Sequence, residues 1–585
     1  SLRCVGQDAC AHAAPQGAGY DMGCYERPVS DVPECDFRID SEAVGLPPLE
    51  LQTTAITSWS AAATSYVWTV SSAGGATIVA TTTQPVLSQT ITETGVWTVS
   101  LQVLFADGAS ASASYEQAIR TLPHEVYVSL DGAHIEPYDA PARAATNIMD
   151  AVRCVTGTSE DPGICHVAPG VYTVANADAP PSSHLVILNT PVRLVGEGND
   201  PSATVIDGEH QYRIIRLAAD GASVENITLH RGANLKGDVT RGYGLQVDTG
   251  SASNCVVSAG LMGTSGTSEH FVLQMGGLIV DTLIHGNVDQ GPNGWTGTGC
   301  ACNLRDGAVM SRCTISNNTA GASGVVYLTG GTTLLDNSRI IGNAHRYRES
   351  GWTSAGVYLD GGARLRDSEV ALNRHSAGCE HTRVHVGGVY AANGTVENCV
   401  ITNNTGGNAC CVGGVYLAGT SRLINSLVAG NSIPYDSYSK CLAGGVAMVS
   451  DSAHLVNCTV ADNFTGRAGY PHGLYQSGGL VTNAIVAFNG EDPARQIGGS
   501  VQNYATSCIF ADTPTPGTGN ICADPKFRNR LESDYRLKSG SPCRRAGTRV
   551  PAITTTLDGL DRNPNLAYDL GCYAAPKTGL IITLR

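Results

Sequence analysis

A short sequence pattern recurs every 24 to 32 residues between residues 224 and 510. It is easiest to see in "VENCVITNN" (396–404) and "LINSLVAGN" (423–431), where a small residue follows Asn and is flanked by apolar residues. A chain that repeats one short unit this often folds as an array of stacked units. The small residues of successive copies are Ile227, Cys255, Thr282, Cys313, Ser338, Ser368, Cys399, Ser426, Cys458, Ala484 and Cys508.

Apolar and polar residues alternate within each copy, which is typical of a β-strand, and no helical segment separates the copies. This predicts an all-β chain built on a right-handed parallel β-helix of about 11 to 13 coils, in which like residues lie above one another. Eight consecutive copies carry Asn five positions after the small residue, and we expect a buried asparagine ladder there. Its members are Asn287, Asn318, Asn343, Asn373, Asn404, Asn431, Asn463 and Asn489.

The chain has 20 cysteines and only 15% charged residues, a combination that favours an oxidising compartment. Cysteines at the small position of the repeat are interpreted as buried thiols, because that position is too tight for a large side chain. Other cysteines lie near the ends of the β-helix or in its insertions, where free thiols and different pairings remain alternatives. The disulfide candidates are Cys154 with Cys165, Cys379 with Cys410, Cys411 with Cys441, and Cys543 with Cys572.

The insertions of the repeat follow the ladder Asn, so they should emerge side by side along one edge of the β-helix. They are rich in residues that suit glycan or protein contacts. An acid–base pair such as Glu349 with His381 could also be assembled there, although long polar loops are more often merely solvated. The candidate binding residues are Arg346, Arg348, Glu349, Trp352, His375, His381, His385, Tyr435 and Tyr438.

Four segments are expected along the chain. Residues 36–123 contain short alternating strands with Trp68 and Trp97 as core candidates, and they predict a small Ig-like β-sandwich. Residues 124–545 form the β-helix and residues 546–585 close it. Residues 1–35 contain "YDMGCYERP" (20–28), a near copy of "YDLGCYAAP" (568–576), and are interpreted as a detached closing or docking segment.

The net charge of −15 and the pI near 5.4 argue against nucleic acid or an anionic membrane surface as partners. No apolar run is long enough to span a membrane. Because the chain starts at Ser1 without an initiator Met, it is interpreted as a processed product or a part of a longer protein that is secreted or displayed on a bacterial surface.

The β-helical part resembles the right-handed parallel β-helix proteins of the pectate-lyase-like superfamily. Within that group, "GGVY" followed by "VENCVITNN" is similar to the repeats of polymorphic outer membrane proteins and related bacterial adhesins. The sandwich resembles a PKD domain through "YVWTV" and "GVWTVSLQV". These resemblances imply an extracellular architecture and specify no activity.

The enzymes of the pectate-lyase-like superfamily use paired carboxylates or calcium-bound acidic clusters, and the sequence contains no Asp-Asp pair. We therefore assign no catalytic residue, metal site or cofactor. The predicted function is a structural or adhesive β-solenoid, a unit of a longer array or head-to-tail filament, whose partners are neighbouring copies and a glycan. The alternative is a polysaccharide lyase or glycoside hydrolase that uses the loop edge at 344–385.

Overall fold

The computed structural model describes residues 32–72, 75–176, 184–233, 241–262, 269–289, 300–320, 324–345, 353–375, 384–407, 411–434, 441–500 and 503–575. The chain divides into two compact units, which are described separately below. The first comprises Ser1–Thr146 with Asp150–His166, and the second comprises Asn147–Met149 with Val167–Arg585. No described helix is long and apolar enough to cross a membrane.

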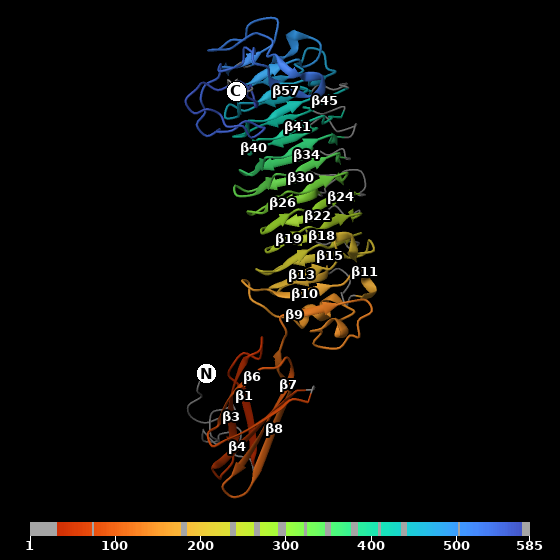
Figure 1. The fold of residues 1–585 in the computed structure, drawn as a ribbon, viewed down its shortest axis with the longest axis vertical. Coiled ribbons are helices and arrows are strands. Elements are labelled where there is room, and N and C mark those ends of the chain that lie inside the picture. The colour runs from red at the N-terminus through yellow and green to blue at the C-terminus, as the bar shows by residue number, and fades with distance from the viewer. Residues whose placement is uncertain are drawn as a thin grey trace, which may run out of the picture. The chain divides into compact units, whose positions relative to one another are not determined.

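The first unit contains two β-sheets, antiparallel except where β2 pairs with β8 in parallel (Figure 1). Their inward residues alternate with exposed ones, and the two tryptophans expected in the core are confirmed there, since Trp68 and Trp97 are both buried. The indole N–H of Trp97 donates to Thr121 Oγ1 at 2.8 Å. One sheet has the order β1 (Glu34–Ile39), β3 (Leu49–Ser58), β6 (Val86–Ile91), and the other β2 (Val44–Gly45), β8 (Ser110–Thr121), β7 (Gly95–Phe105), β4 (Ala63–Ser72), β5 (Thr77–Thr82).

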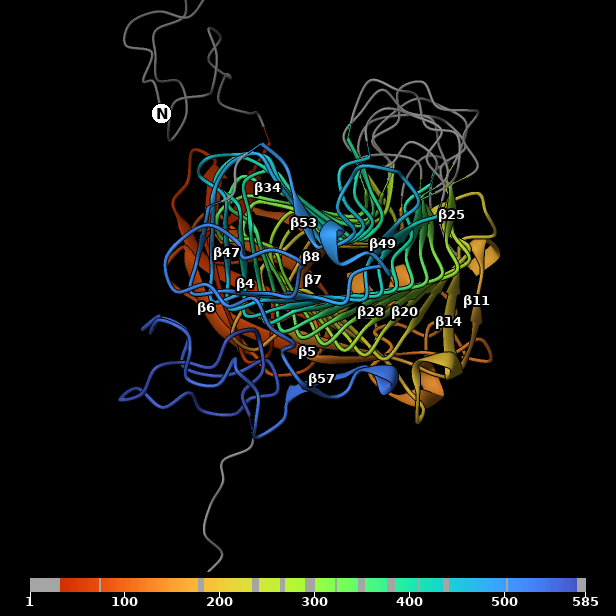
Figure 2. The same ribbon diagram turned by 90° about the horizontal axis from the view of Figure 1, so that it is seen from above.

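The second unit is a parallel β-helix, which confirms the predicted fold class. Figure 2 shows its coils one behind another, with the strands of successive coils in register. Within this unit, sheet 1 runs from β13 (Val192–Gly196) to β54 (Tyr504–Ala505), and sheet 2 from β11 (Gly170–Tyr172) to β55 (Cys508–Ile509). Sheet 3 runs from β12 (His184–Leu188) to β53 (Ile497–Gly498), and the shorter sheet 4 from β21 (Leu261–Met262) to β37 (Arg374–His375).

The chain passes from sheet 1 to sheet 2 through one residue with a left-handed backbone. From Asn226 onward this residue comes just before the small position of the repeat, which explains why Asn and Asp dominate there. Their short polar side chains tolerate a positive φ better than other residues except Gly. The residues are Asn226, Asn254, Asp281, Arg312, Asn337, Asp367, Asn398, Asn425, Asn457, Asn483 and Thr506. In the last coil the small position is Ser507 and not the predicted Cys508, because Ser507 Oγ accepts the Ala484 N–H at 3.1 Å and Cys508 pairs with Ile485.

The eight predicted ladder asparagines are buried and joined by hydrogen bonds. Asn404 is representative: its Nδ2 donates to Asn431 Oδ1 at 2.9 Å and to the Val370 carbonyl at 2.8 Å. Its Oδ1 accepts the Asn373 backbone N–H at 3.0 Å. The last member, Asn489, donates from Nδ2 to Gln496 Oε1 at 3.1 Å, so a glutamine ends the ladder.

A second ladder runs through the small position of the repeat, where hydroxyl side chains accept backbone N–H groups of the preceding coil. Cys313 N–H donates to Ser338 Oγ at 3.0 Å, and Ser338 N–H donates in turn to Ser368 Oγ at 3.0 Å. The cysteines of this column are buried, and burial raises the pKa of Cys399 to about 12. These thiols therefore fill space in the core and are not reactive.

Residues 522–575, here called the closing segment, pack on the outer face of sheet 2 at its last coils. The segment includes β56 (Phe527–Asn529) and β57 (Asp534–Leu537). Outward residues of sheet 2 are apolar here, and they form one core cluster with the segment. The cluster includes Leu427, Ala429, Ala461, Ile485, Ala487, Cys508, Phe527, Tyr535, Leu537, Cys543, Leu570 and Cys572.

Two predicted disulfides are wrong in this structure, where Cys154, Cys165, Cys543 and Cys572 are free thiols. Cys154 Sγ donates to Glu136 Oε1 at 3.8 Å, and Cys165 is fully buried within β10 (Gly163–Val167). Cys572 N–H donates to Thr459 Oγ1 at 3.3 Å, and Cys543 N–H donates to Ser541 Oγ at 3.1 Å.

Candidate functional site

Most of the residues predicted to bind a glycan or partner lie outside the described residues. This holds for Arg346, Arg348, Glu349, Trp352, His381, Tyr435 and Tyr438, and for Cys379 and Cys410. The structure thus leaves the proposed Glu349–His381 pair as a prediction. His375 and His385 are described, and both are buried at the base of the insertions, in contrast to the exposed position expected of a binding loop.

The structure brings these two histidines together with His345 and Thr353, a group here called the histidine cluster. His345 ends β33 (Ala344–His345), His375 ends β37, and Thr353 begins β34 (Thr353–Asp360). The His345 and His375 rings stack with centroids 4.3 Å apart. Thr353 Oγ1 lies 2.9 Å from His375 Nε2 and 2.6 Å from His385 Nδ1. One hydroxyl is therefore shared by the imidazoles of two neighbouring coils.

The chemistry of the histidine cluster is that of a buried hydrogen-bond network. Its four side chains are almost fully buried, so a polymeric substrate would not reach them. Among the described residues no group of three or more His, Cys, Asp or Glu side chains is arranged to hold a metal ion. Sequence inspection selected His375 and His385 but missed Thr353, since a threonine at the start of a strand carries no signal of its own.

A column of stacked tyrosines occupies the outer face of sheet 3 next to the insertions. Tyr327, Tyr358, Tyr390 and Tyr416 stand in register on β30 (Gly324–Thr329), β34, β39 (Val389–Ala391) and β42 (Val415–Leu417). Neighbouring ring centroids are 5.1, 4.8 and 5.1 Å apart, with interplanar angles of 16° or less. Burial raises the pKa of all four phenols. The stack therefore rigidifies the sheet beside the insertions.

The carboxylates on the outer faces of sheets 1 and 2 are engaged by arginines of neighbouring coils. Arg312 pairs with Asp281 at 2.6 Å, and this lowers the pKa of Asp281. Asp336 pairs with Arg366 at 2.8 Å, and Glu397 with Arg364 at 3.1 Å. Asp281 is thus held ionised in a cross-coil ion pair, whereas a general acid at neutral pH needs a raised pKa.

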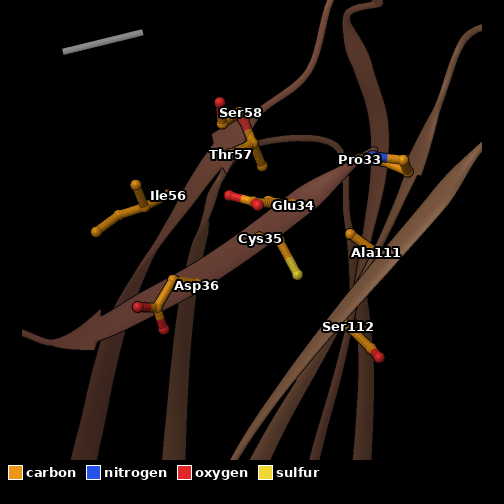
Figure 3. Close-up of a pocket in the computed structure, with 9 residues that line it drawn as sticks. All are labelled: Pro33, Glu34, Cys35, Asp36, Ile56, Thr57, Ser58, Ala111 and Ser112. Carbon is orange, nitrogen blue, oxygen red and sulfur yellow. The ribbon is translucent and has the colours of Figure 1, made fainter. Parts of the chain in front are cut away.

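A small pocket lies in the first unit, between β1 and the start of β8 (Figure 3). Its volume is about 290 Å³, and Pro33, Cys35, Ile56, Ala111 and Ser112 are among the residues that line it. Figure 3 shows the Cys35 side chain pointing into the pocket. Partial burial and the neighbouring Asp36 carboxylate raise the pKa of Cys35, so its thiol is a poor nucleophile. No sequence pattern indicated this pocket.

Two cysteines of the insertions fall within the described residues. Cys411 and Cys441 are both buried at the base of their loops. Cys441 Sγ lies 3.0 Å from Thr465 Oγ1 of the next coil. No disulfide joins Cys411 to Cys441 among the described residues, so the predicted bond between them is wrong in this structure. Cys379 and Cys410 lie outside the described residues, so the predicted bond between them stays a prediction.

Comparisons with known proteins place the chain in no family. The scan against family models and the search of curated proteins found no match. Among solved structures, the chain is similar to the catalytic domain of a GH87 α-1,3-glucanase in complex with tetrasaccharides. That match has 11% sequence identity, covers 82% of this chain and 91% of the other, and has a TM-score of 0.21. A likeness this weak does not bear on the activity of the present chain.

Proposed function

We propose that this protein is a structural or adhesive β-solenoid that works as one unit of a longer array outside a bacterial cell. Its predicted partners are neighbouring solenoids of the same kind and a surface glycan. The PKD-like sandwich (36–123) would act as a spacer in front of the β-helix (124–545). The described solenoid supports a mechanical role because its core and outer faces are filled with ladders and ion pairs that repeat from coil to coil.

One observation carries the proposal: the motif that closes this solenoid occurs twice in the chain. The clasp motif "YDLGCY" (568–573) packs on the last coils, and "YDMGCY" (20–25) repeats it with one conservative change. Gly571 N–H donates to the Asn483 carbonyl at 2.8 Å, and Cys572 N–H donates to Thr459 Oγ1 at 3.3 Å. The Asp569 carboxylate accepts the backbone N–H groups of Arg545 and Ala575 at 2.8 and 2.7 Å.

Glycine is required at the centre of the clasp motif. Gly571 has a φ of +79°, and a Cβ added to it would lie 2.5 Å from Thr459 Oγ1 and 2.9 Å from Ile485 Cδ1. A side chain there must therefore push the motif off the coil. Since residues 20–25 keep the glycine at Gly23, they have the sequence needed to clasp the end of a neighbouring solenoid.

The experiment compares Gly571→Val, Gly23→Val and the double variant with the wild type by analytical ultracentrifugation and electron microscopy. Gly571→Val weakens the protein's own clasp and exposes the acceptor coils, so residues 20–25 of a second copy should replace it and produce end-to-end oligomers. The double variant should stay monomeric. Equal association of the single and double Gly571 variants would indicate non-specific aggregation and refute the proposal.

The alternative, a carbohydrate-active enzyme, can be tested with the same purified protein. A lyase or hydrolase using the loop edge at 344–385 would release products from a polysaccharide panel, and Glu349→Gln would abolish that release. Retention of the protein on a glycan without turnover, unchanged in Glu349→Gln, would instead support the adhesive form of the proposal.

A further inference from the structure

Two cysteines that are 35 residues apart in the sequence meet in the closing segment. Cys508 lies in β55, the last strand of sheet 2, and Cys543 follows β57. Both side chains are fully buried, and both belong to the core cluster that joins the closing segment to the outer face of sheet 2. The repeat pattern assigns Cys508 to the solenoid, so contact between them links the solenoid to the segment that closes it.

Short hydrogen bonds around the two cysteines fix their positions. Cys508 Sγ donates to the Ala523 carbonyl at 3.2 Å. Two residues further on, the Pro525 carbonyl accepts Ser541 Oγ at 2.6 Å, and Ser541 Oγ accepts the Cys543 N–H at 3.1 Å. Both cysteines are free thiols in this structure, and the neighbouring Cys508 thiol, together with burial, raises the pKa of Cys543.

We propose that Cys508 and Cys543 are a disulfide pair that locks the closing segment onto the last coil when the protein matures in an oxidising environment. The oxidant is a small-molecule disulfide. One cysteine thiolate attacks it and releases one small thiol, and the thiolate of the second cysteine then displaces the other. The protein gains one S–S bond, and the two protons lost by the cysteines are carried by the two small thiols that are released.

The neighbouring cysteines are less suitable partners. Cys572 is the partner expected for Cys543 from the sequence, but its N–H donates to Thr459 Oγ1 at 3.3 Å. Cys522 is exposed, and its Sγ donates to the Ala511 carbonyl at 3.0 Å. Because buried thiols with raised pKa values react slowly, the bond should form before the closing segment has packed.

The direct test maps disulfides in the full chain. The protein is unfolded, refolded with glutathione and its disulfide, blocked with N-ethylmaleimide in denaturant, and digested without reductant. Trypsin releases Cys543 in residues 539–544, and chymotrypsin cuts after Phe510 to separate Cys508 from Cys522. We expect a Cys508–Cys543 linked peptide 2 Da lighter than the sum of its parts. Maleimide on both cysteines, or a link from either to Cys522 or Cys572, would overturn the proposal.

A second measurement does not depend on peptide recovery. Limited proteolysis after Arg545 and Arg549 is compared in the oxidised and reduced protein, and reduction should speed this cleavage at least tenfold. Cys508→Ala and Cys543→Ala should each abolish the difference between the two redox states, while Cys572→Ala, a matched buried cysteine of the same segment, should keep it. A redox difference that survives in Cys508→Ala would contradict the assignment.

Discussion

Replacing Asn404 by Ala tests whether the asparagine ladder holds the coils together. The substitution removes four hydrogen bonds: two from Nδ2, to the Val370 carbonyl and Asn431 Oδ1, and two that Oδ1 accepts from Asn373. The Asn373 N–H is left buried without this acceptor, which costs about 1–3 kcal/mol, and the other three bonds contribute about 1 kcal/mol each. We therefore expect a loss of about 4–6 kcal/mol in the free energy of unfolding.

Urea unfolding followed by circular dichroism measures this loss, and hydrogen exchange locates it. The Asn373 amide should lose protection, while amides several coils away should keep theirs. Asn393→Ala is a matched control, because Asn393 belongs to the same coil and makes only exposed hydrogen bonds, one of them to Asp360 at 3.0 Å. It should cost under about 1 kcal/mol. Equal losses in the two variants would refute the reasoning.

Three further predictions concern single positions. Leu372 is exposed and has a φ of +58°, whereas the adjacent coils have Gly342 and Asn403 at the equivalent position. Leu372→Asn should therefore raise the free energy of unfolding by about 1 kcal/mol. An unchanged or lower urea midpoint would count against this. Burial lowers the pKa of His270 to about 3, against about 6.5 in the unfolded chain. The contribution of neutral His270 to the free energy of unfolding should therefore be fully present above pH 6.5 and fall by up to about 1.4 kcal/mol per pH unit as the pH drops toward 3. His270→Gln should flatten this slope in acid titrations of unfolding. Arg339→Ala breaks an exposed pair with Glu369 at 2.9 Å and should cost less than about 1 kcal/mol; a larger loss in the same urea assay would mean that the outer ion pairs act as a cooperative network.

The sequence determined the fold class because every coil of a β-helix requires the same kinds of residue at equivalent positions. A parallel ladder places the same residue of every coil in one column, so positions such as Asn404 and Cys399 had to obey the same packing rule as their equivalents 25 to 32 residues away. The inward direction of the small position, the strand after it and the asparagine column were all predictable for this reason. The turn before the small position was visible as Asn or Asp, and the positive φ values give its cause.

The candidate site could be predicted only in part, since it depends on where the insertions return to the coil. His375 and His385 were selected as loop residues, yet they are buried with Thr353, because the strands of sheets 3 and 4 extend further toward the insertion than the repeat suggested. Insertions differ in length from coil to coil, so the periodicity that specifies the strands does not predict where an insertion rejoins its coil.

The cysteine partners show the same division between sequence and tertiary structure. The repeat predicted Cys508 at the inward small position, whereas in the structure Ser507 takes that position and Cys508 joins the cluster on the outer face of sheet 2. Only the packing of the closing segment on that face decided that Cys543 meets Cys508 and that the Cys572 N–H meets Thr459. Within the coils, a residue's neighbour is given by its position in the repeat. Outside them, contacts are made by a non-repeating chain that returns to apolar surface at Leu427 and Ile485, and these contacts follow from shape and burial in three dimensions.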